Sequence, residues 1–278
     1  MMGFNRIEAK MRAKASIKGA YPHPALVTLV YVLLTTVLTS VIMMFVDNPF
    51  QTAYLYLLDG LYAPEEIFRV IFTAGRVSLY LVLEILISLY TCVMQFGYTS
   101  YGLRLSRWEQ PGYRNLMDGF SMFGRVIGMN ILVAVFTWLW TMLVMIPYIV
   151  VMILAGIFES PALTVLAVLL CIVAVIFGVS VTYRYRLAFY FLLDHPDWGV
   201  MQCIRESKRA MKGRKWSLFA LDLSFIGWYL LSACTLGIVG LWVSPYVGAS
   251  EANFYSWAVY GSFPEPPAPP VNDQSPNF

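Results

Sequence analysis

The chain has 278 residues, of which 59% are hydrophobic and only 13% are charged, and its mean hydropathy is +0.66. About a quarter of the residues in a soluble domain are charged, so this composition excludes an ordinary soluble protein and indicates a single polytopic membrane domain. The net charge is only +3 at pH 7, and its distribution along the chain is more informative than its size.

The first 24 residues form a basic segment that we expect to lie on the membrane surface. Lysines and arginines alternate there with Ile7, Met11 and Ile17, which gives a helix one apolar side and one charged side. Gly19 and a proline-rich turn then end the helix. We interpret residues 1–24 as a cytoplasmic basic amphipathic arm.

Residues 25–260 contain six apolar stretches that are long enough to cross a bilayer as helices. These stretches are 25–46, 77–98, 126–154, 162–182, 216–236 and 238–257. The predicted fold is therefore all-α, a polytopic transmembrane bundle of about six helices with basic helices at its surface. The first stretch is too long for a signal peptide, so we expect it to be retained as an anchor. The tail, 261–278, is polar and proline-rich, which predicts disorder.

The basic residues predict the topology of these helices. All of the 19 lysines and arginines except Arg69 and Arg76 lie in three segments: 1–24, 101–125 and 183–215. By the positive-inside rule, these segments and both termini are cytoplasmic. The segment 47–76 is then on the outside, and its two apolar runs predict short helices on the outer leaflet.

A second basic amphipathic helix precedes the fifth stretch. Trp198, Met201, Ile204 and Met211 share one side of it, which we expect to face the lipid. The residues expected to contact anionic lipid headgroups occupy the other side and the exit: Arg205, Lys208, Arg209, Lys212, Arg214 and Lys215.

The sixth stretch has a small residue at every fourth position. These residues are Gly240, Ser244, Gly248, Ala252 and Ser256. In a membrane such a stripe lets another helix approach closely. We therefore predict a helix-packing face, directed at the fifth stretch or at a second copy of the chain, in which a larger side chain at Gly248 would separate two touching backbones.

Seven polar residues lie in or beside the apolar stretches, near their cytoplasmic ends. They are Gln95, Asn130, Arg184, Arg186, Asp222, Glu251 and Asn253. Such residues are costly in hydrocarbon and usually face the interior of the bundle. One interpretation is a polar cavity for an anionic headgroup, a small solute or a proton. The other is a set of interhelical bonds in which Arg184 or Arg186 neutralises Asp222 or Glu251. Glu84 stands apart, in the outer half of the second stretch.

No motif in the chain indicates catalysis. The sequence has no phosphate-binding loop, nucleophile elbow or HExxH motif. Its four cysteines are scattered singly and each of its two histidines adjoins a proline, so we expect neither a metal nor another cofactor. The basic residues adjoin membrane stretches, which argues against nucleic acid as a partner. We therefore expect that the protein is not an enzyme.

Part of the chain resembles a known family. The run RESKRAMKGRKWSLFALDLSFIGWYLLSACTLGIVGLWVSPYVGASEANFY, together with AKASIKGAY and RLAFYFLLDHPDWG, is similar to a bacterial family named domain of unknown function 975. The resemblance extends from about residue 13 to residue 257. It implies a multi-pass helical protein of the bacterial cytoplasmic membrane, and it brings no activity, substrate or cofactor.

Three hypotheses about function remain from the sequence. The first, which we prefer, is a non-enzymatic membrane protein that binds lipid, itself or another membrane protein through its surface helices and last hairpin. The second is a transporter, or a transporter subunit, that uses the polar residues near the cytoplasmic side. The third is a lipid-modifying enzyme, which we rank last because no catalytic set is present.

Overall fold

The computed structural model of the protein describes residues 3–46, 48–60, 65 and 74–266, and these residues contain helices but no strand. In chain order the helices are α1 (Arg6–Lys18), α2 (Pro24–Val32), the π-helix η1 (Leu33–Val37), α3 (Leu38–Met44), α4 (Pro49–Asp59), α6 (Ala74–Ser106), the 3-10 helix η2 (Tyr113–Met117), α7 (Asp118–Ser121), α8 (Phe123–Phe158), α9 (Pro161–Tyr185), α10 (Ala188–Asp194), α11 (Val200–Ala210), α12 (Lys215–Leu223), α13 (Ile226–Cys234) and α14 (Gly240–Tyr260). The predicted all-helical fold is confirmed.

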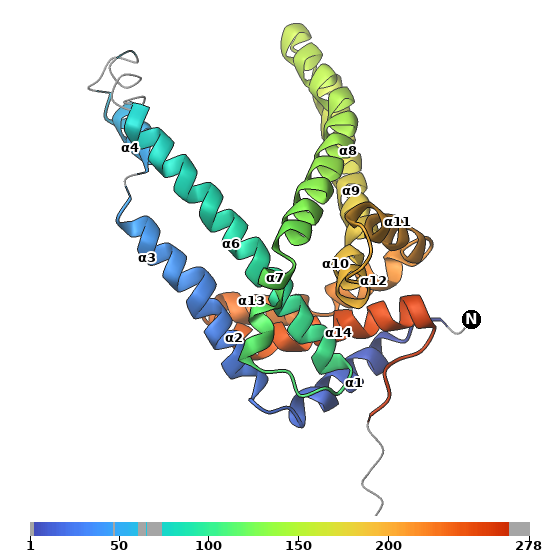
Figure 1. Ribbon diagram of the computed structural model, residues 1–278. Coiled ribbons are helices and arrows are strands. Elements are labelled where there is room, and N and C mark those ends of the chain that lie inside the picture. Colours follow the sequence, from blue (N-terminus) through green and yellow to red (C-terminus); the bar gives the residue numbers. More distant parts are fainter. Residues whose placement is uncertain (1–2, 47, 61–64, 66–73, 267–278) are drawn as a thin grey trace, which may run out of the picture.

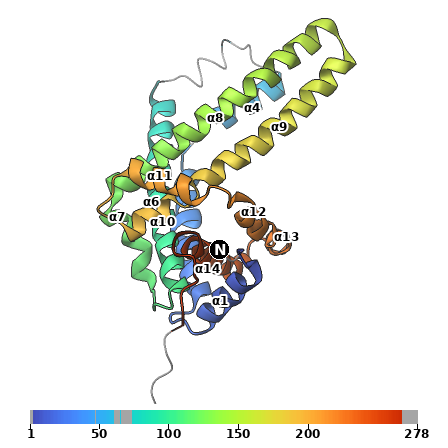
Figure 2. The same cartoon turned by 90° about the vertical axis from the view of Figure 1, so that its right-hand side faces the viewer.

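Two arms of long helices diverge from a packed base (Figure 1). One arm contains α2, η1, α3 and α6, and the other is the hairpin of α8 and α9, which extends far from the base in both views (Figure 2). Five segments are long and apolar enough to cross a membrane: Pro24–Met44, Val77–Ser106, Phe123–Phe158, Pro161–Asp194 and Lys215–Cys234. These five correspond to the first five predicted stretches, and α8 continues through Pro147 without a break.

The sixth predicted stretch, 238–257, forms α14, which is not among the membrane-length apolar helices. Figure 1 shows α14 running across the foot of the arms, and Figure 2 shows it nearly end-on. Eleven of its 21 residues are buried, including Phe254 and Tyr255, because α1, α2, α6, α12 and α13 all pack against it. Helix α14 is therefore the central element of the base, and a sixth span is not confirmed.

The small-residue stripe of α14 meets more than one neighbour. An added Cβ at Gly102 of α6 would lie 3.3 Å from the Gly248 carbonyl carbon, so the two backbones approach closely there. An added Cβ at Gly240 would lie 2.9 Å from Ser232 Oγ in α13, whereas one at Gly248 would meet nothing within 4 Å. The close approach to Gly248 thus depends on the absence of a Cβ at Gly102. An added Cβ at Gly248 itself meets open space, so the prediction that a side chain there separates two touching backbones is not supported.

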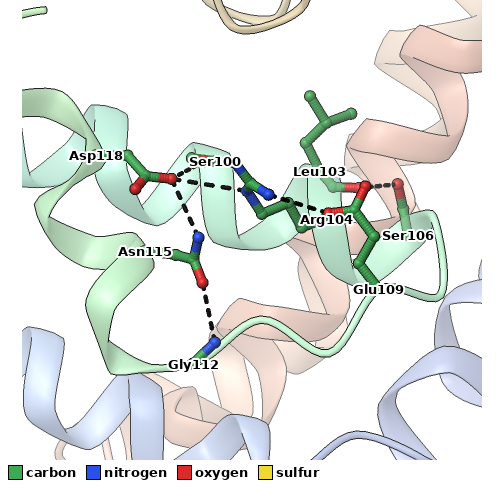
Figure 3. Close-up of polar contacts among 8 residues, drawn as sticks. All are labelled: Ser100, Leu103, Arg104, Ser106, Glu109, Gly112, Asn115 and Asp118. Atoms are coloured by element: carbon green, nitrogen blue, oxygen red, sulfur yellow. Dashed lines mark hydrogen bonds and ion pairs between the residues drawn. The ribbon is translucent and has the colours of Figure 1, made fainter. Parts of the chain in front are cut away.

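The loop after α6 folds back onto that helix and fixes its end. Asp118 Oδ2 accepts hydrogen bonds from Ser100 Oγ at 2.6 Å and from Asn115 Nδ2 at 3.2 Å, and Arg104 Nε lies 3.7 Å away (Figure 3). The backbones meet so closely that an added Cβ at Gly97 would collide with the Leu116 carbonyl oxygen, and one at Gly119 with that of Val93. This contact holds in place the part of α6 that carries Gln95 and Tyr98.

Helix α1 packs on the base through its smallest side chains. Asn5 caps its first turn, and Ala9, Ala13 and Ser16 are buried against α14 and α6. Ile7 and Met11, on the predicted apolar side, are 64% and 60% exposed. The protein thus contacts the small-residue side of α1 and leaves these two apolar side chains at the surface.

The predicted ends and surface segments are described in part. Helix α4 confirms a short helix between the first two apolar stretches, while the second predicted short helix, near 64–72, lies almost entirely outside the described residues. Residues 267–278 of the tail also lie outside them. The first residues of the tail contact the base, since Arg12 Nη1 donates to the Pro264 carbonyl oxygen at 2.8 Å and Phe263 packs beside Phe4.

Candidate functional site

A polar pocket of about 290 Å³ lies against α14, between α2, α6, α10 and α13. Its lining consists of Thr28, Tyr31, Val32, Gln95, Tyr98, Thr99, Gly102, Arg186, Tyr190, Tyr229, Ser244, Val247, Gly248 and Glu251. Three of the seven predicted polar residues, Gln95, Arg186 and Glu251, therefore meet at one cavity. The close approach of α6 to α14 at Gly102 and Gly248 forms part of its wall.

An ion pair crosses this pocket. Arg186, at the carboxyl end of α9, donates from Nη2 to Glu251 Oε1 of α14 at 2.6 Å. The Glu251 side chain is only 13% exposed, whereas that of Arg186 is 45% exposed. A buried carboxylate needs such a partner, because an uncompensated charge is costly away from water. Of the ion pairs predicted between Arg184 or Arg186 and Asp222 or Glu251, the structure thus contains the one between Arg186 and Glu251.

Phenol and amide groups form the opposite wall. Tyr31 OH donates to Gln95 Oε1 at 2.6 Å, and the Tyr31 and Tyr98 rings stack with centroids 4.5 Å apart. The hydroxyl groups of Tyr98 and Thr28 are 2.9 Å apart. Within the described residues, neither Gln95 Nε2 nor the second carboxylate oxygen of Glu251 has a hydrogen-bond partner. Gln95 Nε2 can therefore act as a donor, and Glu251 as a charged acceptor, for a small polar molecule in the pocket.

Asp222 and Arg184 lie outside the pocket lining. Asp222 Oδ2 accepts a hydrogen bond from Tyr183 OH at 2.7 Å, which joins α12 to α9. The guanidinium of Arg184 lies over the Trp140 ring, 5.7 Å from its centroid, and so joins α9 to α8. The predicted pairing of Arg184 with an acid is not found among the described residues.

The remaining predicted polar residues have separate roles. Asn253 is buried and donates from Nδ2 to the Ala9 carbonyl oxygen at 3.0 Å, which ties α14 to α1. Asn130 Nδ2 donates to the Val126 carbonyl oxygen of its own helix at 2.9 Å. Glu84 is exposed on the surface of α6. None of the three lines the polar pocket.

A second polar centre, which the sequence analysis missed, surrounds Asp194. Its Oδ2 accepts hydrogen bonds from Arg107 Nη2 at 2.7 Å, from Tyr255 OH at 2.9 Å and from Tyr260 OH at 3.0 Å. Burial disfavours the charge of Arg107, but the hydrogen bond and the negative charge of Asp194 outweigh it and raise the pKa of the guanidinium. The only signal in the sequence was an acid directly after the apolar run AFYFLL.

This centre adjoins a hollow of about 500 Å³ that includes Arg107, Asp194 and His195. The His195 ring stacks on Trp198 with centroids 3.9 Å apart. Ser262, Phe263 and Pro264 of the tail also line the hollow, so part of it is made by the chain's own end. Within the described part of the chain, no group of three or more His, Cys, Asp or Glu is placed to hold a metal ion.

The apolar side of α11 was predicted to face the lipid, but the structure shows that it mainly faces the protein core. Ile204 and Met211 are fully buried in the protein core, and Cys203 lies with them, against α8, α9 and α10. Met201 is the exception at 46% exposed. The apolar side of α11 thus packs mainly on the protein, because the chain after α10 turns back and places α11 against α8 and α9.

The six basic residues of this region fall into two groups. Three contact the protein itself: Lys208 Nζ lies 5.4 Å from the Phe136 ring centroid, Arg214 Nη1 donates to the Ala258 carbonyl oxygen at 2.6 Å, and Lys215 Nζ donates to Ser180 Oγ at 2.8 Å. The other three are exposed: Arg205, Arg209 and Lys212. Arg209 also pairs with Glu206 at 2.7 Å. The exposed cations point away from the core.

Comparison with known proteins identifies the family. The family model described as "Protein of unknown function (DUF975)" matches residues 1–258. No curated protein and no solved structure matches the chain.

Proposed function

The chain belongs to the family described as "Protein of unknown function (DUF975)". We propose that it is a non-enzymatic membrane protein that binds anionic lipid through the lysines and arginines of its base. We place it in the bacterial cytoplasmic membrane with both termini in the cytoplasm. Five membrane-length apolar helices support the membrane assignment. The proposed orientation depends on the concentration of lysine and arginine in the segments that form the base.

The exposed cations of α11 are the observation that carries this proposal. Because Cys203, Ile204 and Ser207 face the core, Arg205 and Arg209 project from the opposite side of the helix, and Lys212 follows them in the next turn. A lysine or arginine near an anionic membrane surface contributes about 1 kcal/mol of attraction. Three such residues beside membrane-length helices favour anionic over neutral lipid.

The proposal is tested by thermal unfolding of the purified protein in detergent with added phosphatidylglycerol or phosphatidylcholine. We expect phosphatidylglycerol to raise the Tm more, and this difference to shrink when salt is added. The variant carrying Arg205→Gln, Arg209→Gln and Lys212→Gln should lose most of the difference. A matched variant with Arg205→Lys and Arg209→Lys should keep it. Equal effects of the two lipids on the unmodified protein would refute the proposal.

The polar pocket supports a second candidate, the binding or transport of a small polar solute. Gln95 Nε2 and the free oxygen of Glu251 face a cavity large enough for several waters or one small molecule, since one water occupies about 30 Å³ of liquid. A panel of amino acids, sugars and polyamines can be screened for an increase in Tm. An increase that disappears in Gln95→Leu and persists in Asn130→Leu, which lies outside the pocket, would favour this function.

A further inference from the structure

A groove of about 450 Å³ runs along the outer surface where α9 meets α12. Its walls are mostly apolar and include Val175, Ile176 and Val179 of α9 and Trp216 and Phe219 of α12. Both helices belong to membrane-length apolar segments. A groove between them is open to the hydrocarbon of a membrane, because Ile176 and Val179 are 64% and 43% exposed.

One end of this groove is cationic. Lys215 Nζ donates to Ser180 Oγ at 2.8 Å, and both residues line the groove. Arg184 follows Ser180 by four residues, so it lies one turn further along α9 towards the same end. Asp222 is not part of the lining, and it accepts a hydrogen bond from the hydroxyl group of Tyr183, which is part of it. The groove thus combines an apolar channel with a positive end.

This combination matches one class of molecule. An ammonium group has three donors, and Lys215 uses one on Ser180, which leaves two for the oxygens of a phosphate. The exposed Trp216 indole beside it is suited to the headgroup level of a membrane. A neutral apolar molecule would use only the apolar walls, and a free anion would use only the positive end. A phospholipid uses both.

We infer that the groove holds one acyl chain of an anionic phospholipid, whose phosphate is bound by Lys215. This inference rests on the proposed lipid-binding function but is more specific, since it names a single site that is separate from the exposed cations of α11. The site binds a lipid through shape and charge together, whereas Arg205, Arg209 and Lys212 act on the membrane surface through charge alone.

The test is native mass spectrometry of the intact protein after detergent extraction and incubation with phosphatidylglycerol or phosphatidylcholine. We expect the unmodified protein to retain one phosphatidylglycerol. Val179→Trp should fill the groove and lose this lipid. Val168→Trp is the matched control, because Val168 is 53% exposed on the same helix, about three turns away and outside the groove. Lys215→Gln should retain a lipid but lose the preference for phosphatidylglycerol.

The outcomes separate this inference from the broader function. If Val179→Trp and Val168→Trp retain lipid equally, the groove is not a lipid site, even if the α11 cations still favour anionic lipid. If the triple variant of α11 loses the effect of phosphatidylglycerol on Tm while one tightly bound lipid persists, both sites act independently. If Val179→Trp does not fold, Ile176→Trp offers a second test at a more exposed position of the same wall.

Discussion

Helix α14 and helix α8 show how differently two hydrophobic helices are used in this protein. Eleven of the 21 residues of α14 are buried, whereas only Val126, Met129 and Ala155 are buried among the 36 residues of α8. In α14, apolar and polar side chains fix the positions of five neighbouring helices. In α8, the apolar residues cover the surface of an arm that packs chiefly on α9. The base thus determines the fold, whereas the arm leaves most of its apolar residues exposed.

The comparison predicts that matched substitutions cost much more in the base than in the arm. Gly97 and Gly156 are both helical glycines, but an added Cβ at Gly97 collides with the Leu116 carbonyl oxygen, and one at Gly156 meets nothing within 4 Å. Gly97→Ala should lower the free energy of unfolding by about 3 kcal/mol, since backbone atoms cannot move aside as a flexible side chain can. Gly156→Ala should be neutral or slightly stabilising. Unfolding in detergent measures both, and equal effects would contradict the distinction between base and arm.

Ion pairs provide the next contrast. Arg186→Gln leaves the mostly buried carboxylate of Glu251 without its partner, so we expect a loss of about 2 kcal/mol, less than the 3–5 kcal/mol of a fully buried pair because Arg186 is 45% exposed. Arg209→Gln breaks an exposed pair with Glu206, and should cost about 0.5 kcal/mol or less. The same unfolding measurement compares them. A larger effect at Arg209 would show that the exposed surface, and not the pocket, holds the structure together.

Two asparagines give the smallest expected difference. Asn253→Ala removes the bond to the Ala9 carbonyl oxygen and should cost about 1 kcal/mol, a modest value because Asn253 Oδ1 is buried without a hydrogen-bond partner among the described residues. Asn130→Ala removes a bond within α8 only and should change stability by about 0.5 kcal/mol or less. Limited proteolysis provides a second readout, because α1 should be cleaved faster in Asn253→Ala than in the unmodified protein, and no faster in Asn130→Ala. Equal cleavage of both variants would mean that this bond does not hold α1.

Local patterns in the sequence determined where the helices lie. An unbroken run of apolar residues is visible without knowing its neighbours, so the first five stretches and the helical class were predicted correctly. The polar residues Gln95, Arg186 and Glu251 could be recognised as candidates for interhelical contacts, because a polar side chain in or beside an apolar stretch needs a partner. The sequence could not say that these three, and not Asp222 or Asn253, would meet at one pocket.

Tertiary structure decided how the helices are used. A helix of mixed apolar and small residues, such as 238–257, fits a membrane span and a buried central helix equally well, and only its contacts with α1, α2 and α6 distinguish them. The apolar side of α11 could likewise have faced lipid or protein, and only the tertiary structure shows that it packs in the protein core. Arg107 and Asp194 are 87 residues apart, and no local pattern links them. The partner of each side chain depends on which helix surfaces meet in space, and the packing of all the helices in the base determines which surfaces meet.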